Sequence, residues 1–174
     1  GSGRQRQRYA VERAKVPVAQ QKAFDEQLRP VLQELVTVTE KVMELDPASR
    51  NAHALVANAY RGLADIRTDA AAITQFKNKT LEVLTAMNEK LTFEVNEVAM
   101  TPQGEQTQLT GRVINLKATA GQPVKLKFTL LDAAGAPLGT QETTVTLPEV
   151  QGDTPFTLSF NAKNAAGWKY EIVR

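Results

Sequence analysis

The chain has no cysteine and only one histidine, His53, among its 174 residues. Without cysteine there can be no disulfide, no thiolate metal site and no thiol nucleophile, and one histidine removes most metal and triad chemistry. Charge is nearly balanced, with 21 basic and 19 acidic residues and a formal net charge of +2. This excludes a general attraction to nucleic acid or to an anionic membrane. The choice of partner must come from local surfaces.

Long apolar runs are also missing. No stretch approaches the roughly 18 to 20 residues that a membrane span needs, and the first residues lack the apolar core of a signal peptide. Gly1-Ser2-Gly3 resembles a cloning remnant, and the chain does not begin with methionine. Membrane anchoring by a segment upstream of Gly1 therefore stays open.

The motifs of common enzymes are absent too. The sequence contains no GxxxxGK[ST] loop, no GxGxxG turn after a strand, no HExxH helix and no GxSxG elbow. His53 has no nearby histidine or paired carboxylates, so we interpret it as a packing residue. We expect a protein that is not an enzyme, with no catalytic residue, no cofactor and no metal site. The alternative of another class is an uncharacterised hydrolase with a site between two domains.

Glycine is scarce in the first half, where Gly62 is the only one between Tyr9 and Lys90. This predicts helices. Pro30 is expected to kink or restart the first of them, and Asp46-Pro47 to end it and begin the next. The first helix has apolar residues at helical spacing, which we expect on one stripe that packs inward: Leu28, Leu32, Leu35, Val38, Val42 and Leu45.

Two more helices are expected before residue 91. The second ends near residues 65–68, and Thr68 or Asp69 caps the third. Short turns join the helices, so neighbours should pack antiparallel. The predicted apolar positions are Leu55, Val56, Ala59, Tyr60 and Leu63 on the second helix, and Ile73, Phe76, Thr80, Val83 or Leu84, Met87 and Leu91 on the third.

After about Leu91 the apolar period changes to alternation, and glycine, proline and threonine mark turns. Strands are predicted over residues 91–100, 108–118, 123–132, 140–147, 155–161 and 168–173, which together suggest an antiparallel sandwich. The expected fold class is α+β in two domains. Residues 1–17 form a basic, partly disordered leader, residues 18–90 a helical domain, and residues 91–174 the β-sandwich.

The helical part resembles the junction between two tetratricopeptide repeats. Asp46 and Pro47 stand where one repeat passes to the next, Ala57 where helices must approach closely, and Tyr60 at the aromatic position one turn later. The match covers about one and a half repeats. If it holds, Asn51, Asn58 and Arg61 lie on the concave face, where such repeats bind extended peptides.

The β part resembles the FxLYD domain, an immunoglobulin-like module of bacterial envelope proteins. Phe128, Leu130 and Asp132 match the signature, with Leu131 in place of its tyrosine, while Gly111 and Asn115 look like upstream positions of the family. The resemblance implies an extracytoplasmic, non-catalytic module in the periplasm or at the cell surface. From the residues alone, Asp132 is expected to bind amides of the turn that follows it.

These observations favour a protein-protein interaction or scaffold module of a bacterial envelope protein. The alternative within the same class is a structural, self-assembling subunit of a membrane-associated complex. We expect a protein partner, or self-association, through the helical face and no nucleic acid.

Overall fold

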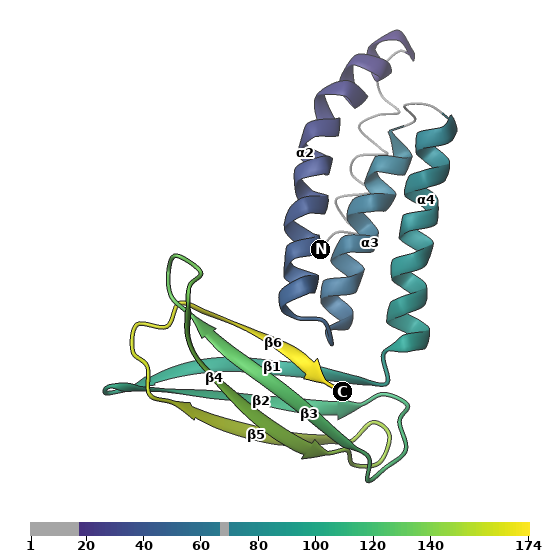
Figure 1. Ribbon diagram of the computed structural model, residues 1–174. Helices are drawn as coiled ribbons and strands as arrows, with labels where there is room; N and C mark the ends of the chain where they lie inside the picture. The colour runs from purple at the N-terminus through teal and green to yellow at the C-terminus, as the bar shows by residue number, and fades with distance from the viewer. Residues whose placement is uncertain (1–17, 67–69) are drawn as a thin grey trace. The chain divides into compact units, whose positions relative to one another are not determined.

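The computed structural model describes residues 18–66 and 70–174 (Figure 1). The chain forms two compact units. One holds the helices, and the other holds Leu91–Arg174 together with the short segment Glu44–Ser49. The predicted leader over residues 1–17 and the predicted caps Thr68 and Asp69 lie outside the described residues.

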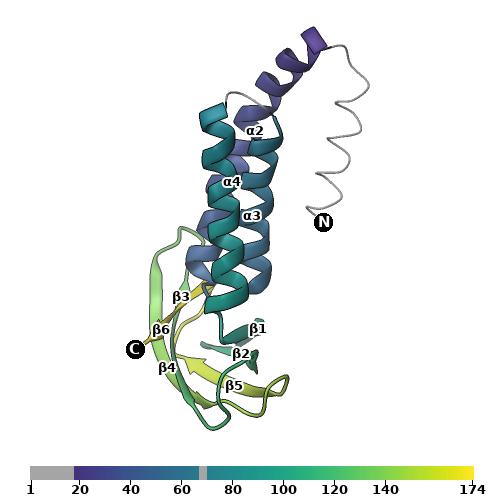
Figure 2. The same ribbon diagram turned by 90° about the vertical axis from the view of Figure 1, so that its right-hand side faces the viewer.

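The helical unit consists of α2 (Val18–Leu45), α3 (Arg50–Asp65) and α4 (Ala70–Thr85), followed by the π-helical turn η1 (Ala86–Lys90). Successive helices run in opposite directions (Figure 1), as their short connections require. The helix α2 continues through Pro30 without a restart. Its N-terminal part is inclined to the rest of the helix in Figure 2, which is the kink expected of an internal proline.

The core of the helical unit forms where α2 and α4 pack against α3. One cluster is built on Val36 of α2 with Ala59, Leu63 and Ile66, and Leu28 and Leu32 pack against it. Leu35, Val38 and Val42, which were predicted to share the buried stripe of Leu28 and Leu32, are exposed instead. The prediction was wrong because α2 has two adjacent apolar faces, and α3 covers only the one that carries Val36.

The β unit is a pair of three-stranded antiparallel sheets, which Figure 2 shows as separate layers. The strand orders are β1-β2-β5 and β4-β3-β6. Six strands were predicted, and six are present within one to three residues at most ends. Their bounds are β1 (Phe93–Gln103), β2 (Gln106–Asn115), β3 (Pro123–Leu131), β4 (Pro137–Thr146), β5 (Asp153–Phe160) and β6 (Gly167–Val173).

The core of the sandwich is centred on Phe128 of β3, which is fully buried. Its ring centroid lies 5.3 Å from that of Phe156, 5.0 Å from that of Tyr170 and 6.2 Å from that of Trp168. Phe156 comes from the opposite sheet, whereas Tyr170 and Trp168 come from β6, the neighbour of β3. Alternation along each strand sends these large side chains into one layer between the sheets.

Gly111 of β2 makes room for this aromatic layer. A Cβ atom at Gly111 would lie 2.5 Å from Cζ of Phe156, which is far inside van der Waals contact. Gly139 of β4 offers a matched position in a strand, because a Cβ atom there would meet only Cδ1 of Phe160 at 3.8 Å. The two glycines therefore differ in the space available and not in the kind of element.

We expect Gly111→Ala to lower the free energy of unfolding of the β unit by about 1 to 3 kcal/mol, since the Phe156 ring must shift within a packed core. Gly139→Ala should change it by less than about 0.5 kcal/mol. The fluorescence of Trp168, the only tryptophan in the chain, reports unfolding of this unit in a urea titration. Equal effects of the two substitutions would show that the predicted clash is absent.

Candidate protein-interaction surface

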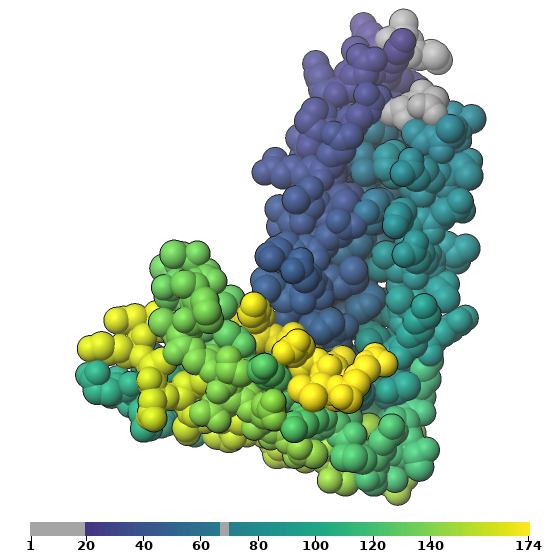
Figure 3. All heavy atoms as spheres, viewed as in Figure 1, coloured from purple at the N-terminus to yellow at the C-terminus, as the bar shows by residue number. Residues whose placement is uncertain are grey.

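A row of exposed aliphatic side chains runs along α2, and we call it the α2 stripe. It consists of Val31, Leu35, Val38 and Val42, whose exposed fractions are 59%, 38%, 53% and 39%. Spacings of four, three and four residues place them on one face of the helix. The dark-blue part of α2 that carries the stripe lies at the surface in Figure 3, where neither α3 nor α4 covers it.

The two long edges of the α2 stripe differ in chemistry. Along one edge lie Leu32 and Thr39, which are partly or fully buried. Along the other edge lie Glu34 and Lys41, which are exposed and each precede a stripe residue by one position. The stripe is therefore bordered by the protein's own core on one side and by one acidic and one basic side chain on the other.

The residues predicted for a concave repeat face lie on α3. Asn51 is exposed, whereas Asn58 and Arg61 are half-buried. Their spacing of seven and three residues places all three on the same side of α3, away from the buried residues Val56 and Leu63. The structure thus brings the predicted trio together on one helix face.

Ala57 and Tyr60 contribute to packing between the helices. Ala57 is buried in one cluster with Val56 of its own helix and Val83 of α4. The Tyr60 ring lies 6.5 Å from that of Phe76 on α4, and its hydroxyl donates a hydrogen bond to Glu40 of α2. Burial, with that hydrogen bond, raises the pKa of Tyr60 to about 12.

Asp46 and Pro47 belong to the segment Glu44–Ser49 of the β unit. The carboxylate of Asp46 accepts a hydrogen bond from the hydroxyl of Tyr170, and that hydroxyl accepts one from the backbone N–H of Ala48 at 2.9 Å. The N–H of Val95 on β1 donates to the carbonyl of Ala48, also at 2.9 Å. Pro47, half-buried, lies between these two anchored residues. Burial and the bond to Asp46 raise the pKa of Tyr170 well above its ordinary value.

From the sequence we predicted that Asp46 caps a helix, and its hydrogen bond to Tyr170 was not predicted. No local signal joins two residues 124 positions apart. The only hint was that Tyr170 occupies an inward position of its strand, where a hydroxyl must find a buried partner.

The β3 strand carries Phe128 and Leu130, and Asp132 follows its last residue. Phe128 and Leu130 are fully buried. Oδ1 of Asp132 accepts hydrogen bonds from the backbone N–H groups of Ala134 and Ala136, each at 2.9 Å. The carboxylate therefore holds the turn between β3 and β4, and the same contacts leave it facing its own backbone rather than a ligand.

Asn115 fixes a second loop in the same unit. Its side chain is fully buried, and its Nδ2 donates to the carbonyls of Ala118 at 2.9 Å and Pro148 at 2.8 Å. Its Oδ1 accepts from the N–H of Ala118 at 2.7 Å. One amide side chain thus satisfies three backbone groups of two loops, which is why an asparagine suits this position.

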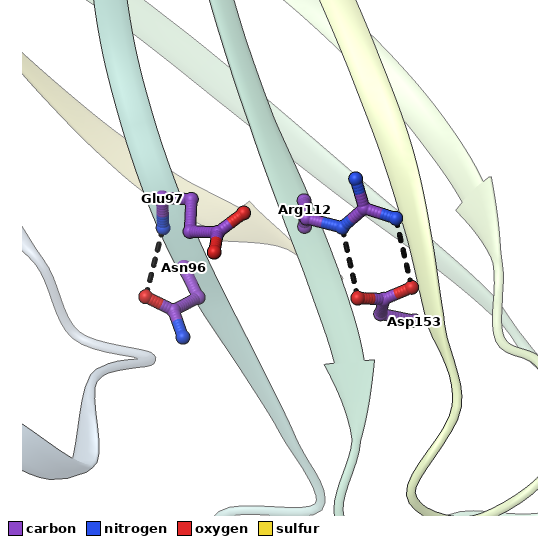
Figure 4. A network of polar contacts seen from close by, with 4 residues as sticks. All are labelled: Asn96, Glu97, Arg112 and Asp153. Atoms are coloured by element: carbon purple, nitrogen blue, oxygen red, sulfur yellow. Dashed lines mark hydrogen bonds and ion pairs between the residues drawn. The ribbon is translucent and has the colours of Figure 1, made fainter.

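A charged cluster lies on the sheet β1-β2-β5 (Figure 4). Arg112 makes a bidentate pair with Asp153 at 2.8 and 2.9 Å, and these hydrogen bonds hold the pKa of Asp153 below its ordinary value. On the neighbouring strand a bulge follows Asn96, whose Oδ1 accepts the N–H of Glu97, a residue with φ of 53°. Both oxygens of the Asp153 carboxylate accept hydrogen bonds from Arg112, so the pair has a structural role in joining β2 to β5.

Residues 18–66 and 70–174 contain no group of three or more histidine, aspartate or glutamate side chains arranged to hold a metal ion. The same residues form no helix with the length and apolar character needed to cross a membrane.

No protein-family model and no curated protein matches this chain. Among solved structures, a DUF1425 family member from Shewanella sp. pv-4 is similar over 47% of this chain and 77% of its own, with 16% identity and a TM-score of 0.37. IrmA from Escherichia coli is similar over 47% and 72%, with 17% identity and a TM-score of 0.37. The DNA glycosylase AlkC from Pseudomonas fluorescens covers 89% of this chain and 50% of its own at 12% identity and a TM-score of 0.30. Similarities this low assign neither a family nor a function.

The hydrogen bonds of the Tyr170 hydroxyl should contribute measurably to the stability of the β unit. Tyr170→Phe leaves the Asp46 carboxylate and the Ala48 N–H without this partner, so the β unit should lose about 1 to 3 kcal/mol of unfolding free energy. The matched control is Tyr60→Phe, which removes a bond to the exposed Glu40 and should leave the β unit unchanged. Urea unfolding followed by Trp168 fluorescence measures both. A loss below about 0.5 kcal/mol for Tyr170→Phe would contradict a structural role for its hydroxyl.

Proposed function

We propose that this chain is a non-catalytic protein-interaction module of a bacterial envelope protein, and that the α2 stripe is its principal binding surface. In this proposal the helical unit is a degenerate tetratricopeptide-like element. The sandwich is an FxLYD-like, immunoglobulin-like domain that acts as a spacer or second contact. The chain works outside the cytoplasm, in the periplasm or at the cell surface.

The observation that carries the proposal is the α2 stripe. Each stripe residue keeps more than a third of its surface in water, although burial of an aliphatic side chain is worth about 1.5 to 3 kcal/mol. A contiguous apolar row bordered by charged side chains is typical of a surface that binds another protein. A partner protein that binds an amphipathic helix face contacts side chains spaced three or four residues apart, as those of the α2 stripe are.

The α3 residues Asn51, Asn58 and Arg61 form the second surface in the proposal. They share one side of α3, and an amide or a guanidinium can bind the backbone or the carboxylate of a peptide. Ala57 supports the tetratricopeptide-like interpretation, since such repeats need a small side chain where their helices approach closely.

The strand orders support the immunoglobulin-like interpretation of the sandwich. In immunoglobulin domains, the first, second and fifth core strands share one sheet, and the third pairs with the sixth in the other. The orders β1-β2-β5 and β4-β3-β6 follow that scheme. The location in the envelope is inferred from the resemblance of Phe128, Leu130 and Asp132 to the FxLYD signature.

Site-specific photo-crosslinking in the bacterium that makes the protein tests the proposal. A photoreactive phenylalanine analogue at position 38, in the middle of the α2 stripe, should give a defined protein adduct. The matched control is position 81, because Leu81 of α4 is 64% exposed but stands outside the stripe. Adducts at position 38 alone are expected. Absence of any adduct at position 38, or equal labelling at the two positions, would refute the stripe as a binding surface.

A further inference from the structure

We infer that the α2 stripe binds the α2 stripe of a second copy of this chain, in an antiparallel, two-fold symmetric pair. This inference rests on the proposed function, because it names the partner of the surface proposed there. Three observations carry it: the spacing of the stripe, the contrast between its two edges, and the order of the charges along the exposed edge.

The spacing is that of a helix which packs against another helix. Steps of four, three and four residues from Val31 to Val42 are the a and d spacing of a heptad repeat, the pattern that fits the knobs of one helix into the holes of another. Every amphipathic helix face has steps of this kind, so the spacing fits a helical partner, and the edges and charges of the stripe carry the choice of that partner.

The contents of the stripe suit an antiparallel partner of the same sequence. When two copies are placed in opposite directions, Leu35 of each faces Val38 of the other, and Val31 faces Val42. Every layer then pairs one a position with one d position, and the four aliphatic side chains of each copy are all covered. The same patch serves on both copies, as a two-fold interface requires.

The edges of the stripe decide between parallel and antiparallel pairing. In a parallel pair, the edge that carries Glu34 and Lys41 would meet the opposite edge of the second copy. That opposite edge holds Leu32 and Thr39, which are already packed or buried in the helical unit. In an antiparallel pair, the charged edge meets the charged edge of the second copy.

The order of the charges then makes the interface self-complementary. Glu34 and Lys41 are seven residues apart and point to the same side of α2. In the antiparallel arrangement that aligns Leu35 with Val38, Glu34 of each copy lies beside Lys41 of the other. Two symmetric ion pairs result. Reversing one sign in each copy would create two repulsive contacts, so the charges select both the direction and the register.

The expected interface is small. Four aliphatic side chains and two charged ones per copy bury less than the roughly 800 Å² per partner of a standard interface. We therefore expect a dimer that dissociates at micromolar concentrations rather than a permanent one.

The test is sedimentation-equilibrium mass of the purified chain between about 1 µM and about 1 mM, a range chosen to span micromolar dissociation. The mass should rise from 19.1 kDa to twice that value and stop there. Val38→Lys should raise the dissociation constant at least tenfold. Leu81→Lys, an aliphatic-to-lysine change at an exposed position off the stripe, should leave it within about twofold. Circular dichroism verifies that both variants keep their helices.

Charge reversal tests the register. Glu34→Lys alone and Lys41→Glu alone should each raise the dissociation constant about 3- to 10-fold, because each creates two like-charge contacts per dimer. The double variant, with both changes in one chain, should recover the original value within about twofold. Additive weakening in the double variant would overturn the antiparallel pairing, as would an unchanged dissociation constant in both single variants.

A constant mass of 19.1 kDa over the whole concentration range would overturn this inference. The proposed function would survive that result if the crosslinked adduct at position 38 contained a different protein. An adduct of twice the chain mass supports both statements, and no adduct at position 38 contradicts the proposed function itself.

Discussion

The organisation of the helical unit depends on one constraint: α2 carries aliphatic side chains over a wider arc than α3 can bury. The face with Leu28, Leu32 and Val36 packs against Ala59, Leu63 and Ile66. The adjacent face with Leu35 and Val38 stays in water. Since α3 covers one face of α2 at a time, the internal packing of α2 and the exposure of its stripe are two results of the same geometry. A second helix on the stripe would complete the burial that the chain's own helices leave unfinished.

The β unit is organised around its aromatic layer and the hydroxyl of Tyr170. Phe128, Phe156 and Trp168 fill the space between the sheets, while Tyr170 presents its ring to that layer and its hydroxyl to Asp46 and Ala48. One side chain thus joins the packing of the sandwich to the conformation of Glu44–Ser49, a segment of the same unit. The loops at Asn115 and Asp132, one buried and the other exposed, follow the same rule, in which a polar side chain satisfies backbone groups that no strand neighbour can reach.

The sequence was sufficient to predict the helices and strands, but it was insufficient to predict which side chains they place in contact. Alternation in Val124, Leu126, Phe128 and Leu130 predicted a half-buried strand, and all four side chains are buried. Scarcity of glycine and the Asp46-Pro47 pair located the helices. The same periodicity could not show which apolar positions of α2 pack inward, because Leu32 and Leu35 lie close together on the helix and differ only in what faces them. The bond between Asp46 and Tyr170 was equally out of reach, since it joins residues 124 positions apart. Of the candidate surfaces, the α3 trio followed from a family resemblance, whereas the α2 stripe emerged only when the covered face was known.

The most direct measurement uses the absence of native cysteine. Chains carrying Val31→Cys and chains carrying Val42→Cys are prepared separately, then oxidised alone and as a mixture. In the antiparallel pair, position 31 lies opposite position 42 of the second copy. Two copies of position 31 lie about 16 Å apart along the helix axis, beyond the roughly 7 Å between Cα atoms that a disulfide can span. The account predicts a disulfide-linked dimer in the mixture and little linkage in either variant alone. Efficient linkage of Val31→Cys to itself, or no linkage in the mixture, would contradict it.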